Sequence, residues 1–345
     1  TDAIDNSAGV STSDHEVNIK ILLDLVIAEG ELTGKQRNAL LAEMTDEVAT
    51  LVLRDNYLQT QWLSVSGRRH GHLLDAQQRF IRFLERQGRL NRALEFLPTD
   101  EEIAERRAEG KGLTNPEGAV LLAYSKIWLY DQLLASSLPD DPWVATALER
   151  YFPKALRTRY ANYLHRHPLR REIIATYVTN SMLNRVGGTF VHYLTEITGF
   201  APAEIVRAFL LTREVFSLRP LWQAIEALDN AVADEVQAEL LIETDRLIVR
   251  ATAWFLRSRR LNEEMGATIA YFSQGVEALN AKLAEVLDEA DCERLKALDN
   301  ARPSQLGDPG DVDPPRRLHR GHGSVDSRGD AIDGGAHERD VLPDP

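Results

Sequence analysis

The chain has 345 residues and carries 53 acidic against 40 basic side chains, which gives a net charge of −13. That balance argues against a general nucleic-acid-binding protein, because the phosphate backbone attracts clustered Lys and Arg. Cys292 is the only cysteine, no signal peptide is visible, and the most apolar run, residues 19–28, is too short to span a bilayer, so we predict a cytoplasmic protein without disulfides or a membrane partner.

The first eighteen residues, TDAIDNSAGVSTSDHEVN, are a short polar run, and apolar periodicity begins directly after it. Such a run predicts a loop that leads into a helix, with Ser13 as the N-cap, because Glu16 three positions later completes a capping box. The free N–H groups of a helix start suit a carboxylate or phosphate, and Gly9 would let the backbone approach a flat ligand. Ordinary capping explains the same pattern without any ligand, so both interpretations stay open at this point.

From about residue 14 to residue 300 nearly every segment has helical spacing, and strand-like alternation is hard to find. Three capping-box patterns mark helix starts, at Thr33–Gln36, Thr99–Glu102 and Thr114–Glu117. Glycines and prolines between the periodic segments mark breaks, which gives roughly ten to thirteen helices with short connections. The fold class is therefore predicted to be mainly α.

Two of the predicted helices indicate how this body packs. Residues 118–134 are apolar almost all round, which predicts a helix at the centre of the core. Residues 232–256 instead carry an apolar stripe, which predicts a helix that buries one face. The stripe consists of Val232, Val236, Leu240, Leu247, Ala251 and Trp254. The acidic residues of the same segment, placed outside the stripe, are Asp234, Glu235, Glu239 and Asp245.

The histidine clusters admit a ligand-binding interpretation and a structural one. His70 and His72 could bind a metal or an anion, but no acidic or Cys partner lies nearby at ligand spacing, which favours a solvated basic loop. His165 and His167 precede Pro168, which favours a role as charge at a helix C-terminus. We therefore predict no metal site.

Other motifs are weaker still. Gly187-Gly188-Thr189 could cradle a phosphate, but it lacks the G-x-G-x-x-G and G-K-[ST] patterns, and a close helix crossing or a helix break fits better. Cys292 has no nearby His to activate it as a nucleophile. Beyond Glu16 the sequence offers no catalytic constellation, and we predict no catalytic residue.

The composition changes abruptly after Asn300. Residues 301–345 contain no Phe, Tyr or Trp and six of the fourteen prolines. Such a segment cannot bury enough apolar surface to offset its chain entropy, so we predict disorder. One hypothesis is that this tail is a non-native extension, such as an out-of-frame product of a GC-rich gene.

The motif Asn6-Ser7-Ala8-Gly9-Val10-Ser11-Thr12-Ser13, followed by Glu16, resembles the N-A-G-G-V-x-x-S…E segment that closes the nucleotide-binding domain of glutamate dehydrogenases. The string through Leu22 is similar to the large bacterial NAD-specific form, and so is PEGAVLLAYSKIWLYDQLLASSLPDDP at residues 116–142. The resemblance covers about residues 1–300. It departs from the smaller hexameric enzymes at Ser7 and Asp14, although the large form shares the Asp-His pair.

The resemblance implies a role for three residues of the motif. Asn6 would reach the nicotinamide of NAD, and Gly9 is assigned with it to cofactor binding. Ser13 would hold a substrate carboxylate. A carboxylate at Asp14 beside that site should weaken anion binding unless it is paired or points away.

The resemblance also implies an organisation and an activity. Residues 1–30 would end a Rossmann-type dinucleotide-binding domain with its last loop and a helix start, residues 31–300 would form an all-helical C-terminal domain, and residues 301–345 the tail. The implied reaction is oxidative deamination of L-glutamate to 2-oxoglutarate and ammonia, in which a hydride passes to NAD.

Two further expectations follow from the resemblance. The family's catalytic Lys and Asp and its phosphate-binding loop have no counterpart here, and the chain opens with Thr1 inside a motif. We therefore expect a fragment that is inactive alone and works with an upstream catalytic domain in a homo-oligomer. The alternative is a non-catalytic helical interaction or regulatory module.

Overall fold

The computed structural model describes residues 4, 7–69, 71, 73–258 and 260–282, together with isolated positions from 285 to 293. Asn6, His70, His72 and the tail at residues 301–345 lie outside the described residues. The described α-helices are α2 (Ser7–Ala28), α3 (Gly34–Arg68), α4 (Leu74–Arg86), α5 (Asp100–Ala108), α6 (Asn115–Leu134), α7 (Ala147–Tyr151), α8 (Lys154–Arg159), α9 (Ala161–Leu164), α10 (Arg170–Val186), α11 (Phe190–Thr198), α12 (Pro202–Val215), α13 (Leu218–Glu226), α14 (Asp234–Leu256) and α15 (Met265–Ala281).

No described residue lies in a strand, so the prediction of a mainly α fold is confirmed. Two short 3₁₀ helices, η2 (Leu138–Asp140) and η3 (Val144–Thr146), connect α6 to α7. The described ranges hold more helices than the sequence predicted, because α7, α8 and α9 have only 5, 6 and 4 residues. Helices this short show no recognisable apolar period.

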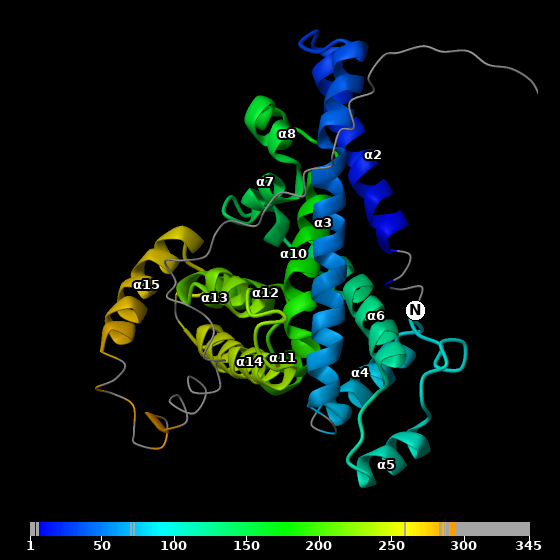
Figure 1. Cartoon of the computed structure of the whole chain (residues 1–345), viewed down its shortest axis with the longest axis vertical. Coiled ribbons are helices and arrows are strands. Elements are labelled where there is room, and N and C mark those ends of the chain that lie inside the picture. The colour runs from blue at the N-terminus through cyan, green and yellow to red at the C-terminus, as the bar shows by residue number, and fades with distance from the viewer. Residues whose placement is uncertain are drawn as a thin grey trace, which may run out of the picture. The chain divides into compact units, whose positions relative to one another are not determined.

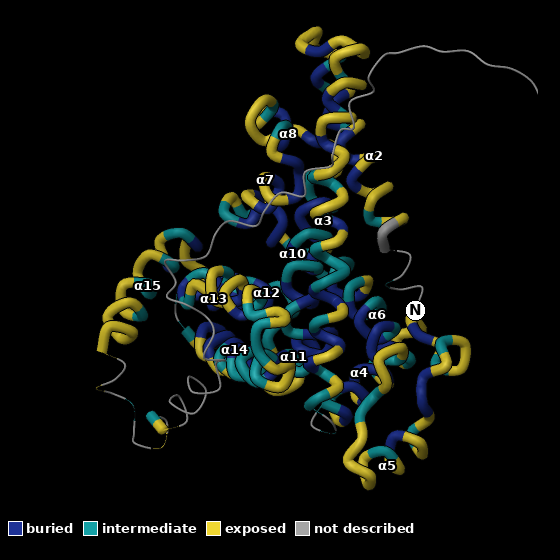
Figure 2. The backbone as a smooth tube through the Cα atoms, viewed as in Figure 1, coloured by how far each residue is buried: buried dark blue, intermediate teal, exposed yellow. Residues whose placement is uncertain are grey.

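Helix α3 is the longest element, with 35 residues, and so measures about 52 Å at the standard rise per residue. It packs against α2, α6, α10 and α14. Figure 1 shows α3 running vertically, with α2 beside its upper half and α6 beside its lower half. Helix α12 joins α11, α13, α14 and α15 into a second group of packed helices. Figure 2 shows that α5 and α15 are largely exposed.

The three predicted capping boxes are all present. The side chains of Thr33, Thr99 and Thr114 accept hydrogen bonds from the backbone three residues on, and in each case the side chain of that third residue closes the box. Pro116 lies in the first turn of α6, where its missing N–H costs no hydrogen bond. Capping depends on residues within one turn, which is why the sequence locates these starts well.

Helix α6 occupies the core as predicted. Leu121, Leu122 and Leu129 are almost completely buried, and Ile127 is the exposed exception at 57%. Lys126, which interrupts the apolar surface of α6, donates a hydrogen bond to Gln59 Oε1 at 2.9 Å. Burial lowers the pKa of Lys126 to about 8.

The buried face of α14 lies about one position away from the predicted stripe. Ala251 is buried as expected, but Trp254 is 55% exposed and Asp245, placed outside the stripe, is buried. Arg69 explains the difference, because its guanidinium lies 3.0 Å from the Asp245 carboxylate and accompanies it into the interior. Burial still raises the pKa of Asp245 to about 7. An acidic residue is therefore a poor marker of the solvent face when a distant Arg supplies its partner.

The Gly187-Gly188 pair permits a close crossing of α3, α6 and the end of α10, as predicted. A Cβ on Gly187 would lie 2.1 Å from Cζ2 of Trp62, and one on Gly188 would lie 2.6 Å from Oγ of Ser125. Gly187 also has a φ of +82°, in the region that side chains disfavour. The side chains of Trp62 and Ser125 thus take the space that a Cβ at positions 187 and 188 would fill.

Gly187→Ala should lower the free energy of unfolding by roughly 2–4 kcal/mol, through backbone strain and a clash with a rigid indole ring. Gly275→Ala is the matched control, because a Cβ there meets nothing within 4 Å. That variant should be neutral or up to about 1 kcal/mol more stable, since Ala favours a helix interior. Thermal melts followed by circular dichroism measure both, and equal melting temperatures would contradict the tight crossing.

Candidate functional site

The start of α2 differs from the prediction of a loop with Ser13 as N-cap. The helix begins at Ser7, and the Ser13 hydroxyl donates to the carbonyl of Val10 at 2.8 Å, as a residue inside a helix does. Glu16 forms an ion pair with Lys20 and does not close a capping box. A polar run can continue a helix when its side chains find partners elsewhere in the fold, and here they do.

Helix α2 has two distinct faces. Gly9, Ser13 and Glu16 are spaced so that they share one face, and all three are exposed. Asp14, His15 and Asn18 lie toward the opposite side, where they contact the helical body. The structure therefore brings Gly9 and Ser13 together on an accessible surface, one helical turn apart.

A polar network fixes the second face of α2. The Tyr151 hydroxyl donates to Asp14 Oδ2 at 2.7 Å and accepts from Asn18 Nδ2 at 2.9 Å. Asn18 Nδ2 also lies 3.2 Å from Asp14 Oδ1. Burial, aided by the Asp14 charge, raises the pKa of Tyr151. Asp14 is thus paired and directed away from the Ser13 face, which removes the electrostatic objection raised by the sequence.

Two buried histidines complete the contact between α2 and the body. The ring of His15 stacks on Tyr151, with centroids 4.4 Å apart. His167 accepts a hydrogen bond at Nδ1 from the Leu169 N–H, so its Nε2 carries the proton and donates to the Asn18 carbonyl at 3.0 Å. Burial lowers the pKa of both histidines. The predicted role of His167 as a charge at a helix end is therefore wrong, whereas His165 is exposed at the end of α9.

A cavity of about 500 Å³ lies on the side of α2 that faces the helical body. Its other walls are formed by α3, α7, α10, α12 and α13. Val10, Ser11, Asp14 and His15 form the α2 side. Five arginines line the same cavity: Arg54, Arg150, Arg185, Arg213 and Arg219. A volume of this size is typical of small-molecule sites.

The first group of arginines is centred on one carboxylate oxygen. Arg213 and Arg219 both use Nε to approach Oε1 of Glu214, at 2.7 and 3.4 Å. Burial lowers the pKa of Arg213 to about 10, which leaves it charged at neutral pH. The two guanidiniums share one negative charge.

The second group repeats this arrangement. Arg54 and Arg185 approach the two oxygens of Glu226 at 2.6 and 2.7 Å. The guanidinium of Arg185 also lies over the ring of Trp222, 4.6 Å from its centroid. Stacking on an indole favours a partly desolvated arginine. Asp55, also on the cavity wall, is influenced by Lys126 and Arg54, and burial raises its pKa.

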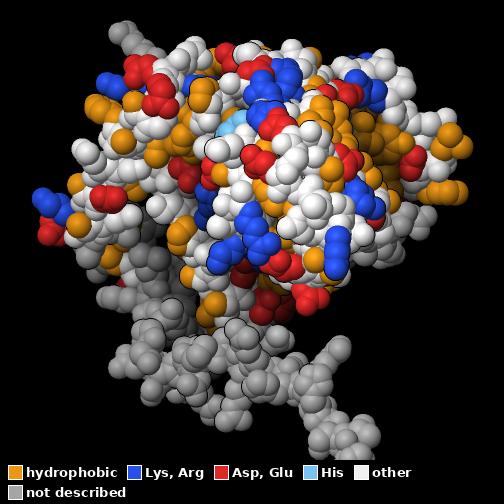
Figure 3. All heavy atoms as spheres, turned by 90° about the horizontal axis from the view of Figure 1, so that it is seen from above, with side chains coloured by type: hydrophobic (Ala, Val, Ile, Leu, Met, Phe, Trp, Pro, Cys, Tyr) orange, Lys and Arg blue, Asp and Glu red, His pale blue; other side chains and the backbone are white. Residues whose placement is uncertain are grey.

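None of these arginines was predicted from the sequence. They come from five helices and are separated by up to 165 positions, so no motif connects them. The overall charge of −13 would even argue against a positively charged cavity. Only the folded structure brings them together. In the view of Figure 3, acidic and basic side chains are interspersed over the surface.

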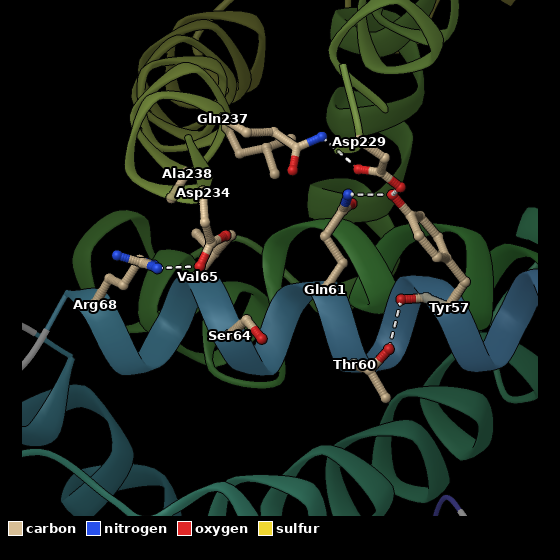
Figure 4. A pocket seen from close by; sticks show the side chains of 11 residues that line it. Tyr57, Thr60, Gln61, Ser64, Val65, Arg68, Asp229, Asp234, Gln237 and Ala238 are labelled. Carbon is tan, nitrogen blue, oxygen red and sulfur yellow. Dashed lines mark hydrogen bonds and ion pairs between the residues drawn. The ribbon is translucent and has the colours of Figure 1, made fainter. Parts of the chain in front are cut away.

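A smaller cavity of about 200 Å³ lies between α3 and α14. Figure 4 shows Tyr57 and Gln237 converging on Asp229, and their hydrogen bonds to it measure 2.7 and 2.6 Å. Gln61 donates to the Tyr57 hydroxyl, and Arg68 pairs with Asp234. These polar groups satisfy one another, which makes this cavity a weaker ligand site than the arginine-lined one.

Metal-binding groups and membrane-spanning helices are absent from the described residues. Among them, no group of three or more His, Cys, Asp or Glu is placed to hold a metal ion. None of the helices in the described part of the chain is both long and apolar enough to cross a membrane.

In the His15→Phe variant, the free energy of unfolding should fall less on acidification than it does in the wild type. The folded pKa of His15 is held below the unfolded value of 6.5, so below that pH the unfolded chain takes up a proton that the folded chain refuses. Stability therefore falls as the pH drops below 6.5, by at most about 1.4 kcal/mol per pH unit for this group. Phe keeps a flat ring against Tyr151 and cannot titrate.

Urea denaturation at about pH 7.5 and about pH 5.5 measures this difference. His165→Gln, at an exposed position, is the control for replacing a histidine that does not contact α2. If His15→Phe keeps the wild-type pH dependence, the pKa of His15 does not differ between the folded and unfolded states as inferred.

Comparison with known proteins identifies the relatives of this chain. Residues 110–305 match the family model described as "Glutamate dehydrogenase, C-terminal", and residues 1–66 match "Bacterial NAD-glutamate dehydrogenase, catalytic domain". Three similar proteins are each named NAD-specific glutamate dehydrogenase. The one from Pseudomonas aeruginosa is 47% identical over 288 residues, the one from Halomonas elongata 45% over 297, and the one from Mycobacterium tuberculosis 40% over 300.

These matches cover most of this chain but little of each relative. They include 84% of the chain for the Pseudomonas protein and 86% for each of the other two, against 18% of each relative. The chain therefore spans less than a fifth of the length of the relatives that it matches.

Proposed function

The chain belongs to the bacterial NAD-specific glutamate dehydrogenase family, and on this premise we propose that it supplies one wall of the dehydrogenase site together with the helical C-terminal body. The complete enzyme would convert L-glutamate to 2-oxoglutarate and ammonia with NAD. The exposed face of α2 carries this proposal, because it presents Gly9 and Ser13 side by side directly after the Asn6 motif position.

The geometry of this face suits the assigned ligands. Gly9 is exposed and has no side chain, so a flat nicotinamide ring can approach the backbone there. Ser13 is exposed, and among the described residues its hydroxyl bonds only to the Val10 carbonyl of the same helix. A rotation about χ1 would free that hydroxyl to donate to a substrate carboxylate. NAD, when bound, would accept the hydride.

The chain's own contribution would be to position α2. The Asp14, Tyr151 and Asn18 network, with His167, fixes the buried face, and a wall held in place orients substrate against cofactor. The resemblance assigns the catalytic Lys and Asp to an upstream domain. We propose that the body docks on that domain in a cytoplasmic homo-oligomer.

In the complete enzyme, Ser13→Ala should raise the KM for glutamate roughly tenfold to a hundredfold, because a hydrogen bond to a charged group contributes about 1.5–3 kcal/mol. Steady-state kinetics measure it. Ser13→Thr is the matched control, since it keeps the hydroxyl and should stay near the wild-type KM. An unchanged KM in Ser13→Ala would limit Ser13 to a local role in the helix.

The chain alone should neither bind NAD tightly nor oxidise glutamate. The reason is that the family's catalytic Lys and Asp and its phosphate-binding loop have no counterpart in this sequence. Absorbance of NADH during incubation with glutamate and NAD tests turnover. Equilibrium dialysis with NAD tests binding. Measurable turnover by the purified chain would contradict the assignment of catalysis to an upstream domain.

A further inference from the structure

The arginine-lined cavity lies on the opposite side of α2 from the Ser13 face. Asp14 and His15 line it, whereas Ser13 does not. A helix with its side chains is about 10–12 Å thick, so the cavity is a separate site and not an extension of the proposed dehydrogenase site. Its chemistry can be assigned without reference to that site.

The cavity has an excess of positive charge. Glu214 serves both Arg213 and Arg219, and Glu226 serves both Arg54 and Arg185, so each group retains one unbalanced positive charge. Arg150, the fifth arginine, makes no ion pair within the described part of the chain. The acidic groups do not cancel this excess.

Both carboxylates on the cavity wall have other partners. Asp14 accepts hydrogen bonds from Tyr151 and Asn18. Asp55 interacts with both Lys126 and Arg54, so its single charge offsets only part of theirs. Five arginines and Lys126 face the four carboxylates Asp14, Asp55, Glu214 and Glu226, which leaves an excess of two positive charges in a protein whose net charge is −13.

The hydrogen-bond donors of Arg213 and Arg219 are largely unused. Each spends only its Nε on Glu214, so neither terminal NH₂ group has a hydrogen-bond partner among the described residues. Arg213 is only 5% exposed, and it lines the cavity. Guanidinium forks of this kind bind carboxylate or phosphate oxygens in a bidentate manner. Guanidinium donors without a protein partner on a cavity wall are available to an incoming anion.

We propose that this cavity binds a small dianion that carries two carboxylate or phosphate groups. One anionic group is held by the forks of Arg213 and Arg219, and the second is attracted by the Arg54 and Arg185 group. Trp222, Leu51 and Leu58 line the cavity and offer apolar surface to the part of the molecule between them. Because the cavity has two separate positive groups, a dianion fits it better than a monoanion does.

Isothermal titration calorimetry on the 345-residue chain tests the proposal, with succinate and inorganic pyrophosphate as dianionic or higher-charged probes and acetate as the monoanion, all at matched ionic strength. At least one of the first two should bind with one-to-one stoichiometry and roughly tenfold or more tighter than acetate. A preference for succinate would identify a carboxylate site, and one for pyrophosphate a phosphate site. No preference over acetate would overturn the proposal.

Arg219→Gln should weaken this binding roughly tenfold or more, because it removes one charged fork. Arg246→Gln is the matched control, since Arg246 is exposed on α14, pairs with Glu243 and does not line the cavity. Equal binding by the two variants would overturn the proposal. Should Arg219→Gln fail to fold by circular dichroism, Arg54→Gln, which removes a charge from the second group at a side chain that is 40% exposed, must show the same loss. The test involves no catalysis, so its failure leaves the dehydrogenase proposal standing.

Discussion

The attachment of α2 to the helical body is the interaction on which the proposed functions of this chain depend. Ile19, Leu22, Leu23 and Val26 supply the apolar part, since all are almost completely buried. The Asp14, Tyr151 and Asn18 network supplies a polar part that fixes the rotation of the helix. Apolar burial tolerates small rotations, whereas hydrogen bonds with defined partners do not. The polar contacts therefore decide which residues of α2 face outward.

The arginine groups illustrate how local charge can oppose the overall charge. Burying a guanidinium is costly, and each carboxylate in these groups offsets the cost for two of them. Such an arrangement is a poor way to gain stability, since well-packed apolar residues would do as well or better. It is a good way to hold positive charge ready for an incoming anion, because the ion pairs already hold the guanidiniums in place.

The parts of the fold that the sequence predicted well are those decided by near neighbours. The capping boxes at Thr33, Thr99 and Thr114 involve residues three positions apart, and α6 is recognisable because it is apolar on nearly every side. The errors have distant causes. Ser13 lies inside a helix because residues near it pair with Tyr151, more than 130 positions away. Asp245 is buried because Arg69 accompanies it. The cavity could not be predicted for the same reason, since its arginines meet only in the folded chain.

The crossing at Gly187 and Gly188 constrains how this sequence can change over evolution. The missing side chains at these positions are matched by Trp62 and Ser125, which fill the space. A larger residue at either glycine becomes acceptable only after the facing side chain has become smaller. Substitutions there should occur in a fixed order and in pairs, so that positions 62 and 187, and positions 125 and 188, would be expected to covary among relatives.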